Sequence, residues 1–307
     1  MICGTTPLTF SITALPITMT DPGQPHPFFA GRVAVIATMH RKEEAIAPLV
    51  EAHLGARALV PQDFDTDRFG TFTGDIHRPD HARATARLKA AAALDHTGET
   101  LAIASEGSFG PHPQIPFLAC DRELVLLLDR RHHLEIAGEY LSTDTNYRHQ
   151  TIRDLEAALA FAQAVGFPSH GLVVKPQGSG AGPWLKGIVS EAQLVEAVTT
   201  ALRQAPQGEV WLETDMRALY NPTRMGVIAL ATQQLIATLR RHCPQCQYPG
   251  FALVQELPGL PCSLCGSPTL LTQTQVYQCQ HCQHQHHQPP ADHPISADPA
   301  HCPYCNP

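Results

Sequence analysis

The sequence has no long apolar segment. None of its apolar runs approaches the roughly 18 residues that a transmembrane helix needs, although 43 % of its 307 residues are hydrophobic. Its first residues, MICGTTPLTFSITALPITM, also lack the positively charged start and compact apolar stretch of a secretion signal. We therefore expect a globular chain with a large core, a cytoplasmic location and no membrane partner.

Positive charge is also scarce. The chain holds 21 Lys and Arg against 28 Asp and Glu, which gives a formal net charge of -7. No Lys or Arg follows Arg241. Because contacts to phosphates in nucleic acid need cationic side chains, the composition makes a nucleic-acid partner unlikely on electrostatic grounds, and we expect the C-terminal part to repel a duplex.

Changes in composition divide the chain into three parts. Residues 1–30 carry few charges and predict a flexible leader, or a start placed too early with Met19 as the true first residue. In residues 31–242, β-branched apolar runs alternate with helical patterns, which predicts an α/β domain whose mixed sheet is covered by helices on both faces. Residues 243–307 are rich in Cys, Gln, His and Pro and predict a small metal-binding module.

The apolar periodicity places the elements of the α/β domain. Helices are expected at 42–55, 81–98, 154–166, 190–205 and 225–242. Strands are expected at 33–38, 56–61, 100–105, 171–176 and 209–214, with a hairpin formed by 123–129 and 134–141. The glycines and prolines of IASEGSFGPHP, residues 103–113, predict that the strand before them ends in a turn near Glu106.

Eight of the ten cysteines form four CxxC pairs. Each pair brings two thiolates onto one turn, and two such turns supply the tetrahedral ligands of a structural zinc. The pairs therefore predict two zinc ions, with these ligands: Cys243, Cys246, Cys262, Cys265, Cys279, Cys282, Cys302 and Cys305. Cys3 and Cys120 are left over, and we expect both to be buried or inert.

Two pairings of the CxxC motifs are open. Consecutive pairs would build two separate ribbons, whereas first with third and second with fourth would build an interleaved module. In the interleaved case residues 251–257 can pair with 271–278, since each strand then leaves or enters a turn of the same site. This strand pairing favours the interleaved arrangement.

Four polar segments lie near predicted strand ends, where ligands of α/β sheets gather. Their acids, hydroxyls and cations are the groups that hold a hydrated divalent metal and a phosphate together. Any one segment also fits a turn cap, a solvated helix face or a surface ion pair, so their recurrence is what favours a site. In chain order they contain Thr38, His40 and Lys42; Asp65, Asp67, Thr71, Thr73 and Asp75; Glu106, Ser108 and His112; and Glu213, Asp215, Arg217, Asn221 and Arg224.

Long segments of the chain resemble an uncharacterised bacterial family, the domain of unknown function 6671. The resemblance covers nearly all the chain from Gly31 and implies no activity. Its segments are GRVAVIATMHRKEEAIAPL, VPQDFDTDRFGTFTGDI, IASEGSFGPHPQIPF, LETDMRALYNPTRM and the ending from PGLPCSLCGSPT to HCPYCNP.

The N-terminal domain is also similar, more faintly, to the inosine and xanthosine triphosphatases, which use a divalent metal. The shared features are a first strand ending in AT, a GTF-like loop, an Ala-rich helix, the SEG at 105–107 and the late TR at 223–224. This resemblance implies that Glu106 helps to hold the metal and that Arg224 or Lys42 meets phosphate. His40 and Glu43 stand where that family has Asn and Lys, which leaves Lys42 one residue early.

These patterns together predict a metal-dependent hydrolase or transferase that acts on a phosphate-containing, nucleotide-like small molecule. Glu106 and Asp75 would carry Mg²⁺, and His40 or Asp215 would position or activate water. The phosphate side would be bound mainly by Thr38, Ser108, Arg217 and Arg224, with Lys42, Thr71, Thr73, His112 and Asn221 as further contacts to the substrate. The alternative is a non-catalytic protein that senses a small ligand and contacts a partner protein through its zinc module.

Overall fold

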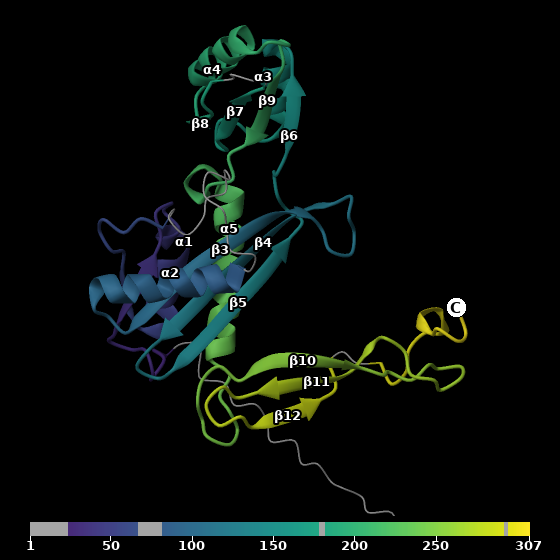
Figure 1. The fold of residues 1–307 in the computed structure, drawn as a ribbon. Coiled ribbons are helices and arrows are strands. Elements are labelled where there is room, and N and C mark those ends of the chain that lie inside the picture. The colour runs from purple at the N-terminus through teal and green to yellow at the C-terminus, as the bar shows by residue number, and fades with distance from the viewer. Residues whose placement is uncertain (1–23, 67–81, 178–181, 292–293) are drawn as a thin grey trace, which may run out of the picture. The chain divides into compact units, whose positions relative to one another are not determined.

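The computed structural model describes residues 24–66, 82–177, 182–291 and 294–307 (Figure 1). The described residues up to Ala237 form one compact unit, and Thr238–Pro307 belong to a second. Each unit is described by itself below. In the described residues, no helix is both long enough and apolar enough to cross a bilayer.

The first unit contains a mixed five-stranded sheet in the order β2-β1-β3-β4-β5. β1 is parallel to both β2 and β3, whereas β3, β4 and β5 pair antiparallel. The expected hairpin is therefore confirmed as β4 and β5. The strands are β1 (Val33–Ala37), β2 (Arg57–Leu59), β3 (Leu101–Pro111), β4 (Ala119–Asp129) and β5 (Leu134–Ser142).

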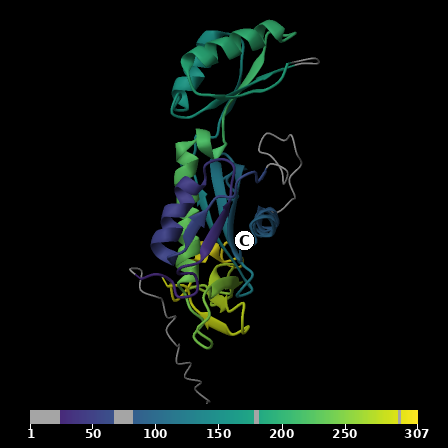
Figure 2. The same ribbon diagram turned by 90° about the vertical axis from the view of Figure 1, so that its left-hand side faces the viewer.

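Helices cover both faces of this sheet, as the sequence predicts. α2 (Ala82–Thr97) packs on one face, and α1 (Glu43–Leu54) and α5 (Pro222–Leu239) lie on the other (Figure 2). The small side chains of α2 let it pack closely on alternate residues of the strands, among them Ala102 and Ala104 of β3. α1 ends at Gly55, whose φ of 67° closes the helix in the left-handed conformation.

A second sheet in the same unit has the order β6-β9-β7-β8 and is antiparallel throughout. Its apolar face packs against α3 (Leu155–Ala164) and α4 (Glu191–Gln204), each capped by the side chain of Asp154 or Ser190. The sequence predicts β7, β9 and both helices but misses β6 and β8, which are short and only weakly apolar. The strands are β6 (His149–Ile152), β7 (Leu172–Pro176), β8 (Leu185–Ile188) and β9 (Val210–Thr214), and a short 3-10 helix follows at Ala218–Tyr220.

The turn expected near Glu106 is not formed. β3 continues through Pro111 and pairs with β4 without a break from Leu101 to Pro111. Gly107 serves close packing rather than a turn, because a Cβ there would lie 2.1 Å from Oε1 of Glu123. Glu106 therefore points to the α2 face of the sheet, in line with Ala104.

The second unit contains a three-stranded antiparallel sheet in the order β10-β11-β12. β10 (Ala252–Pro258) pairs with β11 (Thr272–Gln278), which confirms the pairing expected for the interleaved arrangement. β12 (Gln285–Gln288) completes the sheet, and a short 3-10 helix lies at Pro299–His301.

The contact between α5 and β5 depends on Gly138, and this makes a testable prediction. A Cβ at Gly138 would lie 2.1 Å from the backbone nitrogen of Leu235 and 2.4 Å from the carbonyl of Ala231. Because backbone atoms of a helix cannot move aside, we expect Gly138→Ala to lower the free energy of unfolding by about 3 kcal/mol.

The matched control is Gly110→Ala in β3, where a Cβ would meet nothing within 4 Å. Chemical denaturation of both variants and the parent measures the effect. Equal stability of the two variants would contradict the close helix-sheet contact.

Candidate functional site

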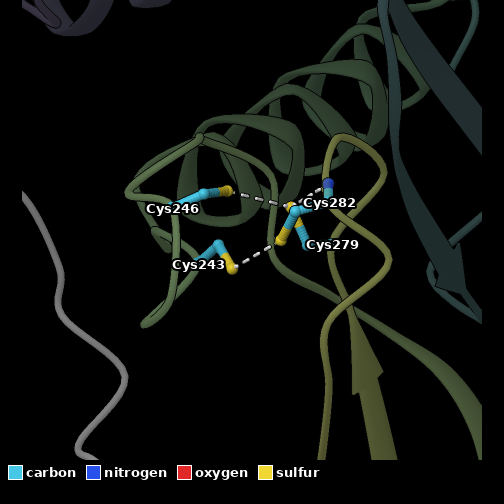
Figure 3. Close-up of side chains that lie close together, drawn as sticks. All are labelled: Cys243, Cys246, Cys279 and Cys282. Atoms are coloured by element: carbon cyan, nitrogen blue, oxygen red, sulfur yellow. Dashed lines mark hydrogen bonds between the residues drawn. The ribbon is translucent and has the colours of Figure 1, made fainter.

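The eight CxxC cysteines gather into two clusters of four. Cys243, Cys246, Cys279 and Cys282 form the first cluster (Figure 3), and the second contains Cys262, Cys265, Cys302 and Cys305. Within each cluster the sulfur atoms lie within 4.8 Å of one another. The first pair thus meets the third and the second meets the fourth, which confirms the interleaved arrangement.

Each CxxC pair is held in a tight turn by its own backbone. The amide after the second cysteine donates to the carbonyl of the first, as from Gln247 to Cys243 at 2.9 Å and from Asn306 to Cys302 at 2.9 Å. Gln247, Gln283 and Gly266 reach these turns with positive φ values of 59°, 61° and 73°. The turns thereby present both sulfur atoms of a pair to the same point.

The spacing of the sulfur atoms fits a tetrahedral zinc. Zn–S bonds of about 2.3 Å place the four sulfurs of a tetrahedron about 3.8 Å apart. The sulfur separations are 3.6 Å for Cys243 to Cys282, 3.6 Å for Cys246 to Cys279, 3.6 Å for Cys265 to Cys302 and 3.9 Å for Cys262 to Cys305. Each cluster could therefore hold one metal ion, and four thiolates are the ligand set of structural zinc.

A second group of side chains lies in the first unit, at the carboxyl end of β1 and beside the middle of β3. We call it the switch-point cluster. It contains three cations and three acids, each less than 8 % exposed: Lys42, Lys89, Arg224, Glu106, Asp121 and Glu123. They come from the start of α1, from α2, β3 and β4, and from the first turn of α5.

The topology explains why this place is suited to a ligand. From β1 the chain passes through α1 to β2 on one side, and then through α2 to β3 on the other side. The connections thus diverge between β1 and β3, which makes this the switch point of the sheet, where open α/β sheets bind ligands. The side chain of Lys42 reaches from the start of α1 to β3, where its Nζ donates to the carbonyl of Ser105 at 3.2 Å.

The cluster contains one ion pair on each face of the sheet. Lys89 Nζ lies 2.5 Å from Oε1 of Glu106 on the α2 face. On the other face Arg224 Nε donates to Oε1 of Glu123 at 2.6 Å, and its Nη1 donates to the carbonyl of Met216. The first turn of α5 is thereby fixed to β4.

Burial shifts two groups of the cluster toward neutrality. Desolvation, followed by the nearby charge of Arg224, lowers the pKa of Lys42 to about 7. Desolvation, followed by the charge of Glu123, raises the pKa of Asp121 to about 8. Both groups can therefore exchange protons near neutral pH, a property typical of functional sites.

The cluster brings together three of the residues that the sequence singled out, namely Lys42, Glu106 and Arg224. Thr38 is buried at the end of β1, and His40 is half-buried just after it. Ser108 is exposed, and Nδ1 of His112 accepts from the amides of Gln114 and Ile115 in a turn.

The fourth segment is largely engaged in local contacts. Asp215 receives two hydrogen bonds from the Arg217 guanidinium, at 3.0 and 2.6 Å. Asn221 caps α5 by accepting from the amide of Arg224, and Glu213 pairs with Lys175. Asp65 is exposed, whereas Asp67, Thr71, Thr73 and Asp75 lie outside the described residues.

Sequence reasoning missed Lys89, Asp121 and Glu123. Lys89 lies on the buried face of α2, where a charge breaks the alanine pattern. Asp121 and Glu123 share one face of β4, two residues apart and before a wholly apolar run. An acid pair at one strand face is the signal that could have found them.

The mixed sheet and the two four-cysteine clusters define an α/β protein with a two-site metal-binding module. The chain belongs to the family described as Domain of unknown function (DUF6671), whose model matches residues 89–307. The match starts at Lys89, so the first two segments that suggested the family lie before it. Among curated proteins and solved structures, none matches the chain.

The cysteine clusters predict a metal content. Protein purified without added metal should contain about two zinc ions per chain, and Cys243→Ser should lower this to about one, because one ligand of a closed site is lost. Elemental analysis measures the content. A parent protein with one zinc or none, and with freely titratable thiols, would disprove the two sites.

The raised pKa of Asp121 predicts a pH-dependent stability. With a pKa of about 8 in the fold and 3.8 for an unperturbed aspartate, the carboxyl group of Asp121 carries a proton in the folded state but not in the unfolded state between these two pH values. The free energy of unfolding should then fall as pH rises through this window, by at most about 1.4 kcal/mol per pH unit.

Asp121→Asn has no titratable group at this position, so this fall in the free energy of unfolding should be absent from the variant. Thermal melting of the parent and the variant at about pH 6 and about pH 8 tests this, since between these pH values the melting temperature of the variant should rise relative to that of the parent. A difference in melting temperature that stays constant with pH would contradict the shifted pKa.

Proposed function

We propose that the protein hydrolyses or transfers a phosphate-containing, nucleotide-like small molecule with the help of a divalent metal ion. The reaction would take place at the switch-point cluster. The zinc module would serve as a structural part and as a contact for a partner protein. The formal net charge of -7 argues against nucleic acid as the substrate, since contacts to its phosphates need cationic side chains.

One observation carries this proposal. Three cations and three acids are buried together at the switch point, although burying ionised groups is costly unless they are paired or hold a ligand. Ion pairs account for Lys89 with Glu106 and for Arg224 with Glu123. Lys42 forms no ion pair with the described residues and donates to the carbonyl of Ser105.

The chemistry of these groups suits a phosphoryl substrate. Arg224 is a planar donor that matches phosphate oxygens, and Lys42 adds a compact charge whose protonation changes near neutral pH. Such groups stabilise the charge that develops when a phosphoryl group is transferred. Asp215 is held by Arg217, so Lys42 and the acids of the cluster fit the handling of protons better than Asp215 does.

A second candidate function rests on the surface of the zinc module. Leu264 and Tyr304 stand within two of the CxxC turns and are each 74 % exposed, and Leu270 and Ile295 are 86 % and 94 % exposed. Exposed apolar side chains mark a protein contact where they form one continuous patch. The module would then bind a partner protein whether or not the first unit is an enzyme.

The test of the proposed reaction is a panel of nucleotides and phosphate esters, assayed with and without Mg²⁺. Lys42→Met removes the charge but keeps the apolar stem, and should lower turnover at least about 100-fold without lowering the melting temperature. Glu106→Gln and Arg224→Lys should also reduce turnover. The matched control is Arg122→Met, which removes an exposed cation from β4.

Two results would count against the proposal. Absence of turnover with every compound would leave the ligand-sensing or partner-binding alternative. Full activity of a folded Lys42→Met protein would place the reaction away from the switch-point cluster.

A further inference from the structure

Two carboxyl groups in the switch-point cluster lack donors. Asp121 is 1 % exposed, and no cation, amide or hydroxyl group of the described residues donates to its oxygens, which lie near the carboxyl group of Glu123. Oε2 of Glu123 likewise receives no such donor in this part of the chain, while Oε1 accepts from Arg224. Three buried carboxyl oxygens on one face of β4 therefore have no cation, amide or hydroxyl donor.

The fold makes room for this pair. Asp121 and Glu123 lie two residues apart on β4, so both side chains point to the same face of the sheet. Glu123 lies opposite Gly107 of β3, and a Cβ at Gly107 would overlap its carboxyl group. The missing side chain at Gly107 is thus what lets the acid stay buried beside Asp121.

The chemistry of the pair favours a hard cation. Buried carboxylates are stabilised by donors or by a metal ion, and donors are missing here. Mg²⁺ and Mn²⁺ prefer carboxylate oxygens, whereas the thiolates of the second unit suit zinc.

We propose that Asp121 and Glu123 together bind a divalent cation of the Mg²⁺ or Mn²⁺ type beside Arg224. This inference rests on the proposed function and deepens it, because it names the acids that hold the metal. Glu106 is a weaker candidate, since Lys89 lies 2.5 Å from its Oε1 and already balances its charge. Arg224 orients Glu123 and acts as a positioning residue for the site.

The experiment measures Mn²⁺ binding to the full chain by electron paramagnetic resonance, with the zinc content checked before and after. The parent should bind one Mn²⁺ ion, and Mg²⁺ should displace it. Asp121→Asn keeps the shape of the side chain and should weaken Mn²⁺ binding at least about tenfold. Glu123→Gln, which keeps an oxygen for Arg224, should have a similar effect and serves as the second variant if Asp121→Asn melts early.

The control removes a carboxylate elsewhere. Glu139→Gln removes an exposed acid on β5, which pairs with Arg122, and should bind Mn²⁺ as the parent does. Glu106→Gln tests the rival ligand in the cluster. Loss of binding in Glu106→Gln but not in Asp121→Asn would overturn the inference, as would a parent that binds no Mn²⁺.

The outcome is separable from that of the proposed function. Mn²⁺ binding that depends on Asp121, with no turnover of any phosphate compound, would uphold the metal site and refute the reaction. Mg²⁺-dependent turnover that Asp121→Asn leaves intact would uphold the reaction and overturn this site.

Discussion

The ion pair between Arg224 and Glu123 holds the start of α5 against the sheet of the first unit. Both side chains are fully buried, and the pair joins the first turn of α5 to the centre of β4. Arg224 also reaches the carbonyl of Met216, in the segment that follows β9. Removing one partner of such a pair typically costs about 3–5 kcal/mol, because the other charge stays buried alone.

The second unit depends on a different constraint. Its apolar core is small, and Phe251, Tyr248 and Tyr277 pack at its first cluster. Four CxxC turns, joined in an interleaved way, tie segments that are up to 43 residues apart in the chain. A metal ion at each cluster would add stability that so small a core does not supply.

Much of the fold follows from the sequence, because β1, α1, α2 and the hairpin of β4 and β5 have strong apolar periodicity. Two strands of the second sheet do not, since β6 and β8 are short and weakly apolar, and β6 pairs with β9, which lies far along the chain. The zinc ligands follow from their spacing alone. Lys42, Glu106 and Arg224 could be singled out as polar residues near strand ends. Gly107 suggested a turn, whereas it lies within β3, because close packing of a glycine against Glu123 leaves no pattern in the neighbouring sequence.

The switch-point cluster is difficult to explain by stability. Replacing buried ion pairs by well-packed apolar side chains is often neutral or stabilising, and the surrounding positions of β3, β4 and α2 are already apolar. A core that needed only stability would therefore have no use for six charged groups at one end of a sheet. Their place at the switch point, with the pKa values of Lys42 and Asp121 shifted toward neutral pH, agrees with the proposed site for a charged ligand. On that proposal, the cost in stability would be the consequence of keeping donors and acids preorganised for the ligand.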